Sequence, residues 1–369
     1  MLIATLTLIG TIIGVGVFGI PYAFAAAGVS IGTAWFLILA LAILVIHMYF
    51  TEIVLATKEK RRLVGYAKKY LGKKAAAATT VCAILSFYGA IVAYIIVGGE
   101  FLYNVFGNIF GGDAMVYQIV FFVFTAIFIA LGLKLVAKVE SVLTALLILT
   151  MLVITAAAFG GGNGANFTAA NIVEFFLPYG IIFFALTGSN AIPEMKDIVG
   201  GDAPVLRRSV IIGTVVASVL TFIFTLAVVA VSGTLTSPEA LRGLGEFLGP
   251  GILIFGSIFG FLAIITSFLV IGLNLKEQFI YDFGFGKMVS WILACVPPLF
   301  IFLFGTKNVI KIMGATGGIL SGFIGIIIIA IYLKVVREKK IKSRLQYLAP
   351  VLILLFIFGI VYEIAYLTS

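Results

Sequence analysis

Long apolar runs, separated by short polar connections, follow one another along the whole chain. Each run is close to the roughly 20 residues that an α-helix needs to cross the hydrocarbon core of a membrane. Several connections are rich in turn-forming residues, such as 160–164 and 232–234. The pattern predicts eleven transmembrane helices, over residues 2–24, 31–56, 77–103, 116–133, 137–158, 172–194, 208–232, 250–274, 288–304, 314–335 and 346–367.

The composition agrees with this pattern and excludes a water-soluble globule. Of the 369 residues, 63% are hydrophobic and 11% are charged, whereas soluble domains are about 45–50% apolar and about 25% charged. No long polar linker divides the chain, so we expect one transmembrane domain over residues 1–369. The sequence therefore predicts an all-α polytopic protein, embedded in the cell membrane.

The net charge of +9 does not indicate a nucleic-acid partner, because the basic residues follow membrane topology. If the N-terminus is cytoplasmic, 21 of the 24 Lys and Arg residues fall in cytoplasmic connections, eight of them between Lys58 and Lys74. Cytoplasmic loops of membrane proteins carry such an excess. We therefore expect a cytoplasmic N-terminus and, with an odd number of spans, an external C-terminus.

The first and sixth spans contain residues that interrupt helices near mid-membrane. Residues 10–21 hold four glycines and a proline, and residues 185–190 (ALTGSN) are followed by Pro193. Inside a helix, glycine costs about 1 kcal/mol and proline about 3 kcal/mol relative to alanine. Gly10 and Gly14 also form a GxxxG pair, so close helix packing is the alternative explanation for the first span.

The two interrupted spans begin two blocks of five spans each. The blocks cover about residues 1–158 and 172–336, and 346–367 is an additional helix. Because each block has an odd number of spans, the second block lies inverted relative to the first. Corresponding breaks in inverted repeats are the best sequence indication of a transporter binding site.

The breaks would supply backbone groups suited to a zwitterion such as an α-amino acid. Amides freed at the first break would face a carboxylate, and glycine allows a close approach. Carbonyls freed at the second break would accept from an ammonium group. The expected substrate site comprises Gly14, Val15, Gly16, Val17, Phe183, Phe184, Ala185, Thr187 and Gly188, with Tyr88 and Tyr94 shaping the side-chain pocket.

The eighth span supplies oxygen ligands for a cation. Ala263, Thr266 and Ser267 share one face of a helix and offer one carbonyl and two hydroxyl groups. Carbonyls freed near Gly10 and Ile13 would complete a cage without a formal charge, which suits Na⁺. The alternative is that both hydroxyl groups bond to carbonyls one turn back.

Four separated segments resemble amino acid permeases. They are residues 14–25 (GVGVFGIPYAFA), 88–94 (YGAIVAY), 187–194 (TGSNAIPE) and 266–269 (TSFL). Together they are similar to the amino acid/auxin permease branch of the APC superfamily, which contains the sodium-coupled neutral amino acid transporters and the bacterial tryptophan/tyrosine permeases. The resemblance covers residues 1 to about 336.

This resemblance implies the LeuT-type fold, a five-plus-five inverted repeat with discontinuous helices 1 and 6 and here one extra C-terminal helix. It also implies that Gly10, Ile13, Ala263, Thr266 and Ser267 form the sodium site called Na2. The chain departs from the sodium-coupled relatives in having glycine at position 10, where they commonly have asparagine. Some proton-coupled relatives carry a lysine in the fifth span, and residues 141–148 contain none, which favours sodium.

Three ionisable residues within the spans have more than one explanation. Glu100, near the outer end of the third span, and Glu194, near the inner end of the sixth, could act in gating or proton relay. Both could equally anchor helix ends. His47, the only histidine, lies in the second span, where we expect a hydrogen bond between helices.

These features favour a secondary active transporter that imports a neutral L-amino acid, with an apolar or aromatic side chain, in symport with Na⁺ by alternating access. H⁺ coupling through Glu100 or Glu194 is the alternative within this class. A passive channel is the alternative class, but the spans show no polar pore stripe. Enzyme chemistry is not expected, because one histidine and two separated cysteines offer no metal cluster or nucleophile–base pair. Beyond Na⁺ we expect no cofactor, and the expected partners are the amino acid and the lipid bilayer.

Overall fold

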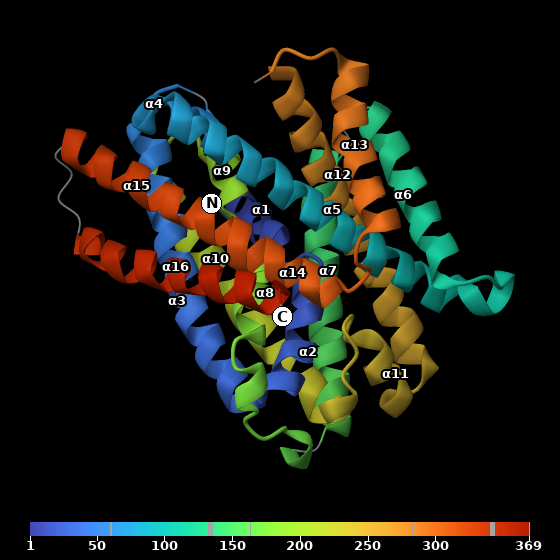
Figure 1. Ribbon diagram of the computed structural model, residues 1–369. Helices are drawn as coiled ribbons and strands as arrows, with labels where there is room; N and C mark the ends of the chain where they lie inside the picture. Colours follow the sequence, from blue (N-terminus) through green and yellow to red (C-terminus); the bar gives the residue numbers. More distant parts are fainter. Residues whose placement is uncertain (60, 132–135, 163, 282, 340–343, 369) are drawn as a thin grey trace.

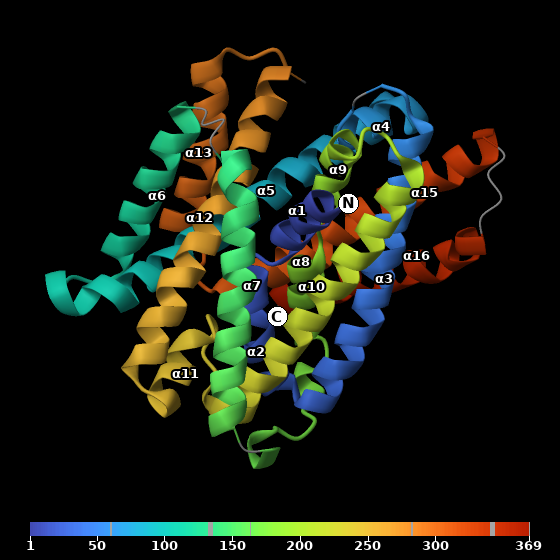
Figure 2. The ribbon, with the colours of Figure 1, turned by 180° about the vertical axis from the view of Figure 1, so that it is seen from behind.

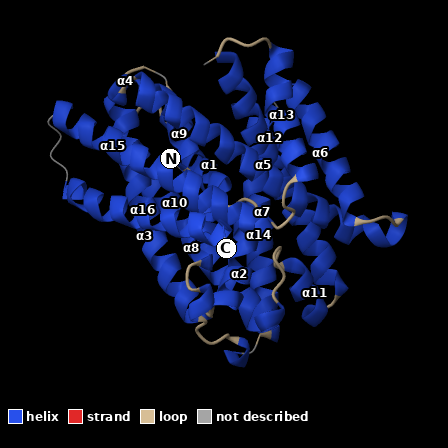
Figure 3. Ribbon diagram, viewed as in Figure 1, coloured by secondary structure: helices blue, strands red, loops and turns tan. Residues whose placement is uncertain are grey.

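The computed structural model describes residues 1–59, 61–131, 136–162, 164–281, 283–339 and 344–368; the side chains of 136–143, 165, 259, 266 and 281 lie outside this description. Within these ranges every regular element is a helix and no β-strand occurs (Figure 3). The apolar runs form membrane-length helices because, in lipid, a helix pairs its own backbone groups. The all-α prediction is therefore confirmed.

By length and apolarity, the described residues contain nine membrane-length helices and one bent helix pair, and a second interrupted pair brings the number of spans to eleven. The first is α1 (Leu2–Ile12) with α2 (Gly16–Ala27), bent by 51° at a break. The sixth is α8 (Leu177–Leu186) with α9 (Ile192–Ile198), interrupted over residues 187–191. The others are α3 (Val29–Ala56), α5 (Lys73–Phe110), α6 (Ala114–Leu131), α7 (Val136–Gly161), α10 (Ala203–Ser232), α12 (Pro250–Tyr281), α13 (Lys287–Phe304), α14 to α15 (Val309–Lys339) and α16 (Ala349–Thr368).

Several spans are longer than predicted, among them α5 (predicted 77–103), α10 (208–232), α12 (250–274) and α14 to α15 (314–335). Helix α5 lies between Gly72 and Gly111, whose φ angles of 92° and 70° end a helix without strain. Helix α12 continues to Tyr281 through several polar residues. Hydropathy marks only the apolar part of a helix, so it misses the turns that extend beyond the hydrocarbon layer.

The connections gather at the two ends of the helices. The short helix α4 (Leu63–Leu71), α9 and the end of α12 lie at the top of Figure 1. At the opposite end lie α11 (Leu241–Leu248) and residues 164–174 (Figures 1 and 2). The basic segment that contains α4 and the glycine-rich connection after α7 are thus on opposite sides, as the charge distribution requires.

Helix α3 is joined by polar contacts to the elements around the second break. Arg207 of α10 donates to the Glu52 carboxylate through Nε and Nη2, at 2.6 and 3.0 Å. Lys196 of α9 donates through Nζ to the carbonyl oxygens of Val54 and Thr57, both at 2.9 Å. These contacts fix the α9 and α10 ends against the end of α3.

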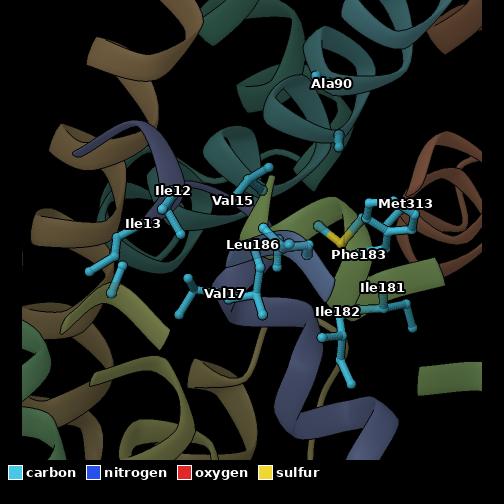
Figure 4. Packing of buried hydrophobic residues seen from close by; sticks show 14 of the residues in the cluster. Ile12, Ile13, Val15, Val17, Ala90, Ile181, Ile182, Phe183, Leu186 and Met313 are labelled. Atoms are coloured by element: carbon cyan, nitrogen blue, oxygen red, sulfur yellow. The ribbon is translucent and has the colours of Figure 1, made fainter. Parts of the chain in front are cut away.

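Apolar side chains pack closely around both breaks (Figure 4). Each of the following is at most 2% exposed: Ile12, Ile13, Val15, Val17, Ile181, Ile182, Phe183 and Leu186. Since the surrounding side chains are apolar, polar partners for the interrupted backbone must come from nearby helices or from a bound molecule.

Candidate functional site

The first break leaves backbone amides at the start of α2. Residues 13–15 are not helical, and the Gly14 amide donates to the Ile12 carbonyl at 2.9 Å. The Val15 amide has no acceptor among the described residues. Gly16 is the first residue of α2, where helical N–H groups have no partner in their own helix. The helix dipole favours negative charge at this point.

The second break leaves carbonyl groups at the end of α8. Thr187 and Gly188 interrupt the helix, and the Thr187 hydroxyl donates to the Phe183 carbonyl at 2.7 Å. The other carbonyls of the last turn, including those of Phe184 and Ala185, have no partner within α8. The helix dipole favours positive charge here.

The two breaks are in direct contact at Gly16. A Cβ atom on this residue would lie 2.6 Å from Ala185 Cα and 3.0 Å from Phe184 Cδ1. The first distance is one that real Cβ atoms do not show, and its partner is backbone, which cannot rotate away. Glycine is therefore required for the amide end of α2 to lie against the carbonyl end of α8.

A cavity lies between the breaks. The predicted substrate residues that line it are Gly14, Val15, Gly16, Tyr94, Phe184, Ala185 and Thr187. It adjoins a second cavity, with which it shares Asn190 and Asn274, and the second cavity reaches Arg62 and Leu63 beside α4. The substrate cavity is thus connected to the α4 end of the molecule.

Tyr88 and Phe183 do not line this cavity. The Tyr88 hydroxyl donates to the Leu293 carbonyl of α13 at 2.7 Å. The Phe183 ring packs against Phe356 of α16, with ring centroids 5.0 Å apart. Both residues are on the predicted helices, but the Tyr88 side chain is turned toward α13. The Phe183 carbonyl, the expected substrate contact, accepts from the Thr187 hydroxyl instead.

Gly188 and Val17 also do not line the cavity. The backbone amide of Gly188 is hydrogen-bonded to a histidine. This amide donates to Nε2 of His47 at 3.1 Å, while Nδ1 of the same ring bonds to the Thr214 hydroxyl at 2.9 Å. Because Nε2 accepts, the proton of the neutral ring is on Nδ1. His47 is 1% exposed and links α3, the second break and α10, which confirms the expected interhelical hydrogen bond. Val17 is buried in the packing of α2.

A smaller cavity beside the first break contains most of the predicted cation ligands. It is lined by Gly10, Ile13, Ala263 and Ser267, together with Thr11, Tyr94 and Thr144. The hydroxyl groups of Tyr94 and Ser267 both lie beside Gly14, 3.0 and 3.7 Å from the position of a Cβ atom on that residue. The side chain of Thr266, the remaining predicted ligand, lies outside the described residues.

The oxygen atoms around this cavity suit a hard cation. Helix α1 ends at Ile12, so the carbonyls of its last turn, including that of Gly10, have no partner in the helix and form the negative end of its dipole. Ser267 and Thr144 add hydroxyl oxygens. Hard cations prefer oxygen ligands, and the residues present therefore fit Na⁺.

Glu100 and Glu194 lie on opposite sides of the breaks. The Glu100 carboxylate accepts from Arg242 Nη2 of α11 at 2.8 Å, and Arg242 Nε lies 3.8 Å from the Glu239 carboxylate. Both carboxylates line a cavity that also includes Lys307. Glu194, by contrast, is exposed in the substrate cavity on the side that leads to α4.

Some residues of the two cavities are absent from the sequence-based site. Thr144 faces the first break so closely that its Oγ1 atom would collide with a Cβ atom on Gly10. Asn190 and Asn274 line the passage between the substrate cavity and the α4 end. In each case the available signal was a polar residue inside or beside an apolar run.

The fold matches those of solved membrane transporters. The crystal structure of MhsT in complex with L-phenylalanine matches with a TM-score of 0.72, at 14% identity and over 98% of each chain. The structure of Mhp1, a nucleobase-cation-symport-1 family transporter in a closed conformation with bromovinylhydantoin bound, matches with a TM-score of 0.65, at 14% identity, over 99% of this chain and 90% of that one. This likeness and the two broken helices define the LeuT-type fold, with five-plus-five inverted repeats and one extra C-terminal helix.

Sequence comparison identifies the family. The tryptophan/tyrosine permease family model matches residues 1–366, and the chain belongs to that family. Tyrosine-specific transport system 1 of Haemophilus influenzae is 27% identical over 338 residues, covering 85% of this chain and 83% of the relative. Glutamine transporter 2 of Aliivibrio fischeri is 24% identical over 357 residues, covering 92% and 90%. The protein is therefore an integral membrane transporter of amino acids and not an enzyme.

Proposed function

We propose that this protein is a symporter that imports a neutral amino acid, with an apolar or aromatic side chain, together with Na⁺. The observation that carries the proposal is the cavity between two opposed half-helix ends, one presenting amides and the other carbonyls. The matched relatives, a tyrosine transporter and a glutamine transporter, support a neutral substrate.

The backbone would recognise the groups that all α-amino acids share. The amides of Val15 and Gly16 would donate to the substrate carboxylate, and the carbonyls of Phe184 and Ala185 would accept from its ammonium group. Phe184 and Tyr94 line the same cavity and would contact the substrate side chain. No charged side chain is needed for either contact, so a neutral zwitterion leaves no charge unpaired.

The small cavity beside the first break would hold Na⁺. The candidate ligands that line it are the carbonyls of Gly10, Ile13 and Ala263 and the hydroxyl group of Ser267, and Thr144 is a further candidate. Thr266 stays a candidate from the sequence alone. A bound cation would supply positive charge at the negative end of α1. Tyr94 lines both cavities, so the ion and substrate sites share a wall, through which their affinities would be linked.

The orientation follows from the basic residues and the position of the cavities. We place α4 and the N-terminus on the cytoplasmic side of the membrane, and α11 and the C-terminus on the external side. The substrate cavity then opens inward, and the Arg242–Glu100 ion pair belongs to an outer gate. Glu194 would be exposed to the cytoplasm in this conformation.

Ion-replacement uptake in proteoliposomes tests the proposal. Purified protein is given either a Na⁺ gradient or a choline gradient, and a panel of amino acids is compared. We expect saturable uptake of a neutral amino acid that requires Na⁺. Equal uptake in choline that follows an imposed pH gradient would replace Na⁺ by H⁺ as the coupling ion, and non-saturable flux would indicate a channel.

A further inference from the structure

Glu363 is a buried carboxyl group in the last span, outside both cavities. It lies on α16, and the residue is 4% exposed. Three glycines of neighbouring helices surround its side chain. A Cβ atom would lie 2.5 Å from Glu363 Oε1 if built on Gly314 of α14, and 3.0 Å from Oε2 if built on Gly180 of α8 or on Gly318.

The glycine-lined slot places this carboxyl group against a specialised turn. A π-helical turn, η5 (Thr316–Ser321), joins α14 (Val309–Ala315) to α15 (Gly322–Lys339). Gly318 lies within this turn, and Gly314 lies in α14 just before it. Such turns occur often at functional sites. Because glycine has no side chain, it allows the carboxyl oxygens to reach the backbone of two neighbouring spans.

No charge compensates this carboxyl group. Glycine positions surround its oxygen atoms, and no hydrogen bond or ion pair of the carboxyl group occurs among the described residues. On α8 the titratable neighbour is Tyr179, whose buried hydroxyl has no partner among the described residues. The π-helical turn contains no charged residue, and Lys311 on α14 is exposed. On α16 itself the neighbours are Tyr362 and Tyr366, with Glu174 beyond them.

An ionised carboxylate in such surroundings is unfavourable. Moving an unpaired charge from water into an apolar environment costs far more than moving a neutral carboxyl group, and the group binds a proton instead. Ionisable residues inside membrane spans are accordingly functional candidates. Glu363 is therefore neutral while α16 is packed on α8 and η5 in the arrangement observed.

We propose that Glu363 is a proton-binding site whose occupancy controls the packing of the last span against the outer half of the sixth. Only the π-helical turn η5 and the end of α8 separate the Glu363 slot from the substrate cavity. A Cβ atom on Gly317 of the same π-helical turn would lie 2.6 Å from the Phe184 amide nitrogen, and both Phe184 and Ser321 line that cavity. Loss of the proton would hydrate the carboxylate, separate α16 from α8 and η5, and favour opening of the side that carries α11.

The test compares three full-length proteins: the wild type, Glu363→Gln and the control Glu338→Gln. Glutamine has the shape of a protonated glutamate but cannot ionise. Glu338 is 47% exposed on its side chain, 3.9 Å from Lys334, so the same chemical change there leaves the slot untouched. Infrared titration in detergent should show a protonated-carboxyl band that Glu363→Gln lacks and Glu338→Gln retains.

The conformational effect is measured with a cysteine at Val97, which lines the cavity beside Glu100 and is 1% exposed. The native Cys82 and Cys295 are first replaced by alanine. From acidic to alkaline solution we expect alkylation of this cysteine to accelerate at least about fivefold in the wild type and the control. In Glu363→Gln the alkylation rate should stay within about twofold of the slow wild-type rate in acidic solution, because glutamine is neutral at every pH.

An unchanged pH profile in Glu363→Gln, or a protonated-carboxyl band that survives the substitution, would overturn the proposal. The Glu363 proposal rests on the proposed function only where it takes the side that carries α11 to be external. Neither readout uses a substrate or an ion gradient. The failure of Na⁺ coupling or of the substrate assignment would therefore leave this test intact.

Discussion

Substitution of Gly16 by alanine is the smallest change that should strongly weaken substrate binding. The added methyl group would meet Ala185 Cα at 2.6 Å, Ala185 Cβ at 2.8 Å and Phe184 Cδ1 at 3.0 Å. The aromatic ring can turn aside, but the Ala185 backbone cannot. The two half-helix ends must therefore separate, and the amides and carbonyls no longer face one substrate molecule together.

The size of the effect follows from the cost of overpacking. An extra methylene in a well-packed interior costs typically about 1–3 kcal/mol. Two of the three contacts are with the backbone or Cβ of Ala185, so we expect the upper end of this range. At about 1.4 kcal/mol per factor of ten, this corresponds to a loss of roughly 100-fold in substrate affinity.

The assay is equilibrium binding of the transported amino acid to purified protein, with thermal unfolding as a check on folding. Gly160→Ala is the matched control, because Gly160 lies in α7 with nothing within 4 Å of its Cβ position. Combining Gly16→Ala with Ala185→Gly should restore part of the affinity, since one of the clashing atoms is removed. Affinity within twofold of the wild type in Gly16→Ala would refute the assignment of this contact to the substrate site.

Three further substitutions test other parts of the site. His47→Ala leaves two buried polar groups unpaired and should lower the stability by about 1–3 kcal/mol per group, measured by thermal unfolding; an unchanged melting temperature would contradict the role of the ring. Arg242→Ala removes the ion pair with the third span and should increase alkylation of a cysteine at Val97, whereas an unchanged rate would exclude a gating role. Ser267→Ala should raise the Na⁺ concentration needed for half-maximal uptake by about tenfold while saturating Na⁺ restores the rate, and a purely reduced maximal rate would argue against an ion ligand.

The broken helices could be predicted because their cause is local. Glycine and proline weaken a helix whatever surrounds them, so residues 10–21 and 185–190 mark the breaks from sequence alone. The long apolar runs likewise locate the spans, with errors at the ends of α5, α10, α12 and α14 to α15, where the helices extend beyond the predicted ranges.

The direction of individual side chains could not be predicted, because it depends on how each helix is rotated about its axis. Tyr88 is in the correct span, but its contact with Leu293 turns it from the substrate cavity. Thr144 is also beyond local sequence rules, since its relation to the first break comes from packing between α1 and α7. A single sequence carries the period of a helix but not its orientation among ten others.

The polar contacts of α3 have a mechanical consequence. Glu52 pairs with Arg207, His47 joins Gly188 to α10, and Lys196 binds the last carbonyls of the helix. These links all lie in the last ten residues of α3 or directly after it, and sliding this end past α9 or α10 would break several of them at once. A buried donor or acceptor left unpaired costs about 1–3 kcal/mol. We therefore expect the ends of the second, sixth and seventh spans that meet there to move together, and relative displacement of these spans to occur away from this end of α3.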